Sequence, residues 1–335
     1  MTILPRVILL TVEHLQVGKV RYRRLGTVGW VQGYNHRFGV TSWLYLMVVC
    51  CLFAQACATP TGKLNQLASD YGLDTYSIRA DGFNLLVFDN LATYEAGKPE
   101  YPDHDGVLRI YLEGDGSPWK HRVIVMPDPT PRNPLMLRLM SYERNPAVYL
   151  GRPCYNGFHN QVACDNSLWT SARYSETIVS SMTSAIRALS KRHNATQIWL
   201  MGHSGGGTLA MLLAEQLPQV TRVVTLAANL DTDGWTKHHR YTPLYSSINP
   251  ATKQDLRTEI WQWHLIGGRD TVIPVQLIKP VIMRQASASG FEFPGFSHGC
   301  CWEGVWPDVL DALMRNEPSG VPGVQFKFRT LQGGS

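Results

Sequence analysis

One pentapeptide, Gly202-His203-Ser204-Gly205-Gly206, constrains the fold of this chain more than any other stretch of its sequence. It follows the apolar run 197–201, which reads as a buried strand, and it precedes good helix formers that meet no breaker before Pro218. A G-x-S-x-G sequence between a strand and a helix predicts a sharp turn that lifts the serine hydroxyl clear of the sheet edge. Glycines flank the serine because side chains there would collide with the crossing backbone. The alternative is a Gly-rich turn that contains serine by chance.

Strands and helices alternate along the rest of the chain. Apolar or alternating runs typical of strands occupy 75–79, 84–89, 107–112, 147–150, 222–227, 260–266 and 292–293. Helical spacing is found at 135–142, 167–193 and 305–314, and residues 63–72 are interpreted as a short leading helix or coil. This alternation predicts an α/β fold with a mostly parallel central sheet and helices on both faces. We find no internal repeat and no break in composition, which predicts a single domain.

The charge distribution argues against a nucleic-acid partner. The chain has 335 residues, 44% of them hydrophobic, and a formal net charge of +5. All of that excess lies in residues 1–56, and the remainder carries 25 basic and 25 acidic residues. A neutral remainder has no basic stripe with which to bind phosphates. We therefore expect no nucleic-acid binding.

The first 56 residues resemble a leader for export. The apolar run 43–54 has the length of a signal-peptide core and is too short to span a bilayer. Ala54-Gln55-Ala56 supplies a small-x-small cleavage pattern, and Cys57 follows where a bacterial lipoprotein carries its lipid. We expect residues 1–56 to be removed and 57–74 to form a linker. The mature protein is then periplasmic, anchored to a membrane through a lipid on Cys57, or secreted.

Four cysteines remain in the mature part, namely Cys154, Cys164, Cys300 and Cys301. An even number in an exported protein suggests disulfides, and three pairings are possible. A metal site that combines His298 with these thiols is an alternative, but adjacent cysteines lack the usual ligand spacing. We expect no metal and no cofactor, because there is also no G-x-x-x-x-G-K-[ST] loop for a nucleotide.

A nucleophilic serine needs a histidine base and an acid that orients it. Asp270 follows the strand 260–266 and the glycines Gly267 and Gly268, and His298 lies between the last short strand and the last helix. The order serine, acid, histidine at successive strand ends is typical of such sites. Rival acids are Asp231 and Asp233. Rival histidines are His203, which lies within the turn, His264 in a strand, and His238 and His239 in a polar stretch.

With these three motifs in order, residues 75–316 resemble the α/β-hydrolase superfamily, and within it the exported bacterial serine hydrolases. The resemblance implies Ser204 as nucleophile, His298 as general base and acid, and Asp270 as the group that fixes the imidazole tautomer. The segment 113–116 resembles the superfamily's His-Gly-x-Gly loop, with glutamate in place of histidine. It implies an oxyanion hole built from the N–H of Gly205 and that of Asp115, or in second place Gly116. The Gly/Pro-rich tail 317–335 lies outside the resemblance.

The expected function is hydrolysis of small to medium carboxylic esters through an acyl-enzyme on Ser204. Tyr155, Phe158 and Trp302 are candidates for an aromatic substrate wall, and the partner is a small-molecule ester. A peptidase, thioesterase or acyltransferase is possible with the same chemistry. A non-catalytic, envelope-anchored binding protein on the same scaffold is the alternative from another class.

Overall fold

The computed structural model describes residues 18–24, 27–33, 59–91 and 106–326, and the chain divides into two compact units, 1–58 and 59–335. In the first unit the described residues form an antiparallel hairpin of β1 (Gly18–Arg24) and β2 (Thr27–Gly33). The apolar run 43–54, its cleavage pattern and Cys57 lie outside the described residues. Residues 59–74, which are most of the expected linker 57–74, belong to the second unit.

A nine-stranded sheet forms the centre of the second unit. Its strand order is β13-β12-β11-β10-β9-β5-β8-β4-β3, and all neighbours from β12 to β8 are parallel. The strands are β3 (Asp74–Ala80), β4 (Phe83–Asp89), β5 (Val107–Leu112), β8 (Ala147–Leu150), β9 (Gln197–His203), β10 (Val220–Leu226), β11 (Trp261–Gly267), β12 (Ala288–Phe293) and β13 (Val324–Gln325). Antiparallel partners complete both edges. The predicted, mostly parallel sheet is confirmed.

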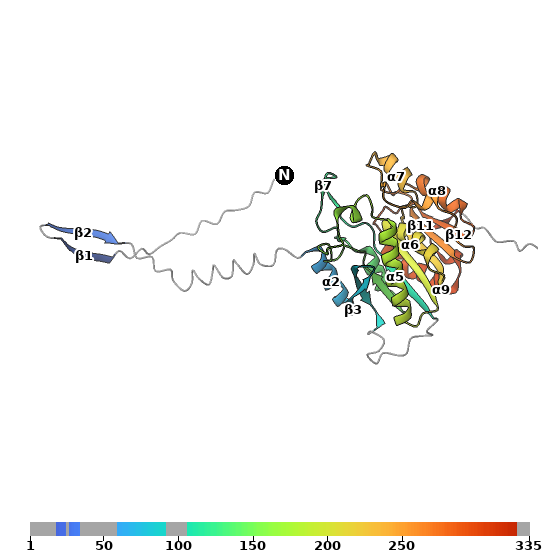
Figure 1. The fold of residues 1–335 in the computed structure, drawn as a ribbon, viewed down its shortest axis with the longest axis horizontal. Coiled ribbons are helices and arrows are strands. Elements are labelled where there is room, and N and C mark those ends of the chain that lie inside the picture. Colours follow the sequence, from blue (N-terminus) through green and yellow to red (C-terminus); the bar gives the residue numbers. More distant parts are fainter. Residues whose placement is uncertain (1–17, 25–26, 34–58, 92–105, 327–335) are drawn as a thin grey trace, which may run out of the picture. The chain divides into compact units, whose positions relative to one another are not determined.

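Helices cover both faces of this sheet, as predicted (Figure 1). The helices are α2 (Pro60–Asp70), α4 (Leu135–Met140), α5 (Glu176–Arg192), α6 (Gly205–Gln216), α7 (Thr232–His239), α8 (Val275–Arg284) and α9 (Trp302–Arg315). Side chains of α5, α6 and α8 belong to one hydrophobic cluster, and those of α2, α4 and α9 belong to the other. Within β5, Leu108 and Ile110 face the first cluster while Val107 and Tyr111 face the second. This alternation is what a strand buried on both faces requires.

Several boundaries differ from those expected. The helix expected over 167–193 begins only at Glu176, because the Ser175 hydroxyl caps it by accepting from the Ile178 N–H at 3.5 Å. Before it lies a 3₁₀ turn, Asn166–Trp169. The last helix begins at Trp302 instead of 305, and β12 is longer than expected. The helices α7 and α8 were not expected. The strand β13 was not expected either; it lies inside the predicted tail and pairs with β12.

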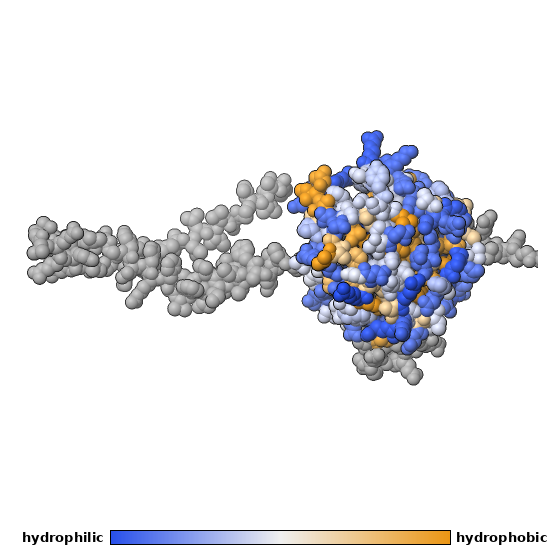
Figure 2. Space-filling model, viewed as in Figure 1, coloured by the Kyte–Doolittle hydropathy of each residue, from blue (hydrophilic) through white to orange (hydrophobic). Residues whose placement is uncertain are grey.

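A small hairpin that was not expected from the sequence lies outside the central sheet. It consists of β6 (Trp119–Lys120) and β7 (Ile124–Val125). Trp119, Val123 and Ile124 on this hairpin are exposed, and Figure 2 shows hydrophobic surface where β7 lies. Within the described ranges, no helix combines the length and hydropathy needed to cross a membrane.

Candidate active site

Ser204 occupies the turn between β9 and α6. Its backbone lies in an unusual region, with φ 52° and ψ −121°, and its N–H donates to the Leu226 carbonyl at 2.9 Å. Such a conformation costs on the order of 1–3 kcal/mol and is found mainly at functional sites. A Cβ at Gly202 would overlap the Gly206 carbonyl, and one at Gly206 would overlap the Leu112 carbonyl. The structure therefore has the strand, turn and helix that the motif predicts.

The three side chains expected to converge are in contact. The His298 Nε2 atom lies 3.0 Å from Ser204 Oγ, and His298 Nδ1 lies 2.8 Å from Asp270 Oδ2. The other Asp270 oxygen accepts from the N–H groups of Val272 and Ile273, each at 2.8 Å. Because the ionised carboxylate can only accept, Nδ1 carries the proton and Nε2 is free to accept from the serine hydroxyl. The arrangement can deprotonate Ser204.

The rival residues have other partners. Asp231 caps α7 by accepting from the Gly234 N–H at 3.0 Å, and Asp233 accepts from the Asn249 amide at 2.9 Å. His264 is buried in β11 and bonded to the Thr225 hydroxyl at 2.8 Å. His238 is exposed. His239 donates to the Val272 carbonyl at 2.9 Å.

His203 has a positioning role that sequence reasoning missed. Its Nε2–H donates to the His298 carbonyl at 2.9 Å, and the Trp302 indole N–H donates to the same oxygen at 3.1 Å. Burial lowers the pKa of His203 to about 3, with a smaller contribution from His298, so the ring is neutral at ordinary pH. The two donors hold the backbone that carries the His298 side chain.

Glu113 stands where the superfamily loop has histidine. Burial raises the pKa of its carboxyl to about 7, although the carboxyl accepts from the N–H groups of Gly114 at 3.2 Å and Met136 at 3.0 Å. The His203 Nδ1 atom is 4.0 Å from Glu113 Oε1. Because His203 stays neutral, this approach is not an ion pair. Glu113 fixes the start of the loop through backbone contacts.

The carboxylate of Asp115 lies at the centre of a buried polar cluster. It accepts from the guanidinium groups of Arg152 at 2.6 Å and Arg173 at 2.9 Å, and from the Tyr174 hydroxyl at 2.6 Å. Burial acts to raise the pKa of Asp115, but Arg173, Arg152 and Tyr174 outweigh it and hold the pKa below its usual range. The Tyr155 hydroxyl also donates to the Asp115 carbonyl at 3.1 Å. The loop 113–116 is thus fixed by side chains distant in sequence.

Backbone donors for an oxyanion are available near Ser204. In the part of the chain that the structure describes, no group accepts from the N–H of Gly205, Asp115 or Gly116, whereas the Gly114 N–H donates to Glu113. The Gly205 N–H is free because it lies in the first turn of α6. The Gly114 N–H is occupied, which leaves Asp115 and Gly116 as the loop donors.

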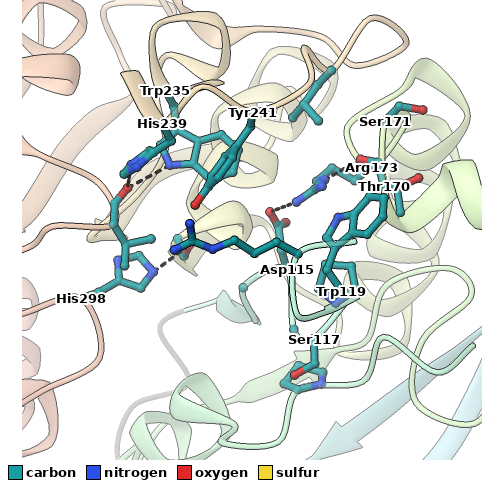
Figure 3. A pocket seen from close by; sticks show the side chains of 18 of the residues that line it. Asp115, Ser117, Trp119, Thr170, Ser171, Arg173, Trp235, His239, Tyr241 and His298 are labelled. Carbon is teal, nitrogen blue, oxygen red and sulfur yellow. Dashed lines mark hydrogen bonds and ion pairs between the residues drawn. The ribbon is translucent and has the colours of Figure 1, made fainter. Parts of the chain in front are cut away.

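A cavity of about 1030 Å³ opens over Ser204 and His298. Its walls are formed by residues 113–119, 131–133 and 239–244, together with Arg122 of the small hairpin, Thr170, Ser171, Arg173, Trp235 and Val272. Figure 3 shows Trp119, Trp235 and Tyr241 around this space. The Trp235 and Tyr241 rings are 5.2 Å apart in an edge arrangement.

The aromatic wall expected from the sequence was wrong. None of Tyr155, Phe158 and Trp302 lines the cavity. Tyr155 and Trp302 are fully buried, and Phe158 packs against the hydrophobic cluster under α9. Trp302 instead meets Phe293 and Phe296 edge-on, at 5.5 and 5.1 Å. These three rings bury their apolar area in the protein interior, whereas other aromatic side chains, Trp119, Trp235 and Tyr241, line the cavity.

The structure pairs the four cysteines as near neighbours in sequence. Cys154 is bonded to Cys164, with Cα atoms 5.6 Å apart, and Cys300 is bonded to Cys301. Across the described residues, no group of three or more His, Cys, Asp or Glu side chains is placed to hold a metal ion. The Cys300 and Cys301 sulfurs that the metal alternative would combine with His298 are bonded to each other.

Comparison with solved structures agrees with the topology. An esterase of Pyrococcus furiosus, Pf2001, superimposes with a TM-score of 0.52 at 11% identity, over 80% of this chain and 95% of its own. The chain has the α/β-hydrolase fold. A puromycin hydrolase aligns with this chain at a TM-score of 0.52 and 16% identity, over 74% of this chain and 39% of that one.

Sequence comparison adds a local match. Residues 147–227 match the family model of class 3 lipases, a stretch that runs from β8 to just past β10 and includes Ser204. It includes neither Asp270 nor His298. A search of curated protein sequences found no match.

Proposed function

We propose that the chain is a serine hydrolase that cleaves carboxylic esters of small to medium size through an acyl-enzyme on Ser204. The hydrogen-bonded series from Ser204 Oγ through the His298 imidazole to the Asp270 carboxylate carries this proposal. A hydroxyl alone is a weak nucleophile at neutral pH, and this geometry supplies the base it needs.

The reaction then follows in two halves. Ser204 Oγ attacks the acyl carbon while His298 Nε2 takes its proton, and Asp270 stabilises the imidazolium. The N–H groups of Gly205 and Asp115 receive the developing oxyanion, and His298 then protonates the departing alcohol. In the second half His298 removes a proton from water, which attacks the acyl carbon and releases the acid and the Ser204 hydroxyl.

The choice of esters has weaker but consistent support. Ser204 itself lines the cavity, so a substrate of modest size that enters the cavity reaches the nucleophile. The Pyrococcus furiosus neighbour is described as an esterase. Thioesters and amides undergo the same attack and are the alternatives that a substrate panel separates.

Labelling with a fluorophosphonate probe tests the nucleophile. Wild type should be labelled and Ser204→Ala should not, while Ser69→Ala, which removes an exposed hydroxyl on α2, should be labelled like wild type. Turnover of p-nitrophenyl esters should fall at least about 10⁴-fold in Ser204→Ala. Equal labelling of Ser204→Ala would contradict the proposal. Faster cleavage of peptide anilides or acyl thioesters than of any ester would replace the esterase assignment.

We also propose that the protein is exported and that its leader ends before Cys57. The support is the sequence pattern, together with the Cys154–Cys164 pairing, which is typical of oxidising compartments. The intact mass of the mature protein should correspond to a chain that begins at Cys57, with or without added lipid. A mass that still includes residues 1–56 would contradict export.

A further inference from the structure

Three arginine side chains line the cavity without a carboxylate partner among the described residues, namely Arg122, Arg132 and Arg240. The cavity also contains two acidic side chains. Asp115 already forms ion pairs with Arg152 and Arg173, and the Glu113 carboxyl accepts hydrogen bonds from backbone N–H groups. The walls above Ser204 therefore carry uncompensated positive charge. Charge of one sign in a cleft with low-dielectric walls attracts ligands of the other sign.

The backbone holds two of these arginines in an unfavourable conformation. Arg122 has φ 64° and its neighbour His121 has φ 53°, and the Val123 N–H donates to the Lys120 carbonyl at 3.3 Å. His121 and Arg122 are thus the central residues of a β-turn in the three-residue loop between the paired residues Lys120 and Ile124, and positive φ at both central positions is usual for Asn and Gly. Arg240 ends α7 at φ 56°, at a position where glycine is usual. These turns place both arginines at the border of the cavity, one at the tip of the small hairpin and the other at the end of α7.

An aromatic surface lies beside the first of these cations. The Arg122 guanidinium carbon is 5.9 Å from the centre of the Tyr241 ring. The Tyr241 ring stacks on His239 with centres 5.2 Å apart, and Trp235 meets Tyr241 edge-on (Figure 3). The cavity thus joins a flat apolar surface to cationic groups contributed by the hairpin and by the end of α7.

We infer that the substrate of this hydrolase is an anionic ester, whose carboxylate or phosphate is bound by Arg122 and Arg240 while its apolar part lies against Trp235 and Tyr241. The inference rests on the proposed function and names the substrate class of the same site. Guanidinium groups bind both anions through charge-assisted hydrogen bonds. Arg132 adds positive charge to the same cavity.

A matched pair of esters tests the preference. The anionic member is 4-acetoxybenzoate and the neutral member is its methyl ester, with each kcat/KM divided by the rate of hydroxide-catalysed hydrolysis to remove leaving-group effects. We expect the anionic ester to be favoured about tenfold, which corresponds to about 1.4 kcal/mol. Added NaCl should reduce this preference because salt screens the arginines. 4-Acetoxyphenyl phosphate, against 4-acetoxyphenyl methyl ether, shows whether phosphate is the better anion.

Variants connect the preference to the named residues. Arg122→Gln and Arg240→Gln should each reduce the anionic-to-neutral ratio several-fold, and Arg122→Lys should retain part of it. The ratio cancels any loss of folded enzyme. Arg79→Gln, which removes an exposed charge from the edge strand β3, is the matched control and should keep the wild-type ratio.

Equal turnover of both esters, or a preference that survives in Arg122→Gln and Arg240→Gln, overturns the inference while Ser204 labelling leaves the proposed function intact. Absence of both labelling and hydrolysis overturns the proposed function itself.

Discussion

Replacement of Asp115 by asparagine should destabilise the second unit and slow the enzyme together. The change removes one negative charge from between two guanidinium groups that are nearly inaccessible, with side-chain exposures of 3% for Arg152 and 7% for Arg173. Removing one partner of a buried ion pair typically costs about 3–5 kcal/mol. The Asp115 side chain is 20% exposed, so water offsets part of this loss and we expect about 3 kcal/mol. For a unit of this size that is about 5 °C in Tm.

The same substitution also affects the reaction. Without the carboxylate, the loop 113–116 loses the contacts that fix its position beside Gly205, and kcat should fall more than KM rises. The control is Asp308→Asn, which removes an exposed charge from α9 that forms no ion pair with any residue the structure describes. In an Asp115→Asn background, Arg173→Gln should recover part of the lost stability, because it removes a charge left without a partner.

Thermal unfolding and steady-state ester hydrolysis measure both effects. A Tm and kcat for Asp115→Asn within error of those for Asp308→Asn would refute the reasoning. So would strictly additive losses in the double variant, since the argument depends on a direct interaction between Asp115 and Arg173.

Three further predictions concern single features. Asp270→Asn should lower kcat about 10⁴-fold, because an amide favours the wrong imidazole tautomer, and activity within tenfold of wild type would contradict this. The raised pKa of Glu113, about 7 in the fold, means that its contribution to stability is complete below about pH 4.5 and is lost as pH rises through 7. Between pH 4.5 and 7, the unfolding free energy of wild type, measured in urea, should therefore fall by about 3 kcal/mol more than that of Glu113→Gln. An equal pH dependence of the two proteins would contradict this prediction. Replacing both Cys154 and Cys164 by serine should lower the unfolding free energy by about 3 kcal/mol, because the loop between them is no longer closed in the unfolded chain, and an unchanged Tm would count against this.

The sequence was most informative where chemistry is tied to a local turn. Ser204, Asp270 and His298 each follow a strand within a few residues, and parallel strands bring their carboxyl ends to one edge, so order alone predicted their convergence. The central sheet could be predicted for the same reason, since its strands are short apolar runs between helical segments.

What the sequence did not show depends on contacts between distant segments. The Asp115 carboxylate meets Arg152 and Arg173, which are 37 and 58 residues away, and no spacing rule links them. Composition could not separate a tryptophan that packs in the core, such as Trp302, from one that faces the cavity, such as Trp235. The hairpin that carries Arg122 was not expected because its loop lacks the usual Asn-Gly signal.

The left-handed backbone at Ser204 also sets a limit on how the protein can evolve. Glycine would adopt that conformation without penalty, so a lineage selected for heat resistance alone would gain by discarding its nucleophile. On the proposed function, serine at this position is needed for turnover, and thermal tolerance has to be acquired elsewhere in the fold. Descendants that no longer need the reaction are expected to change first at this residue.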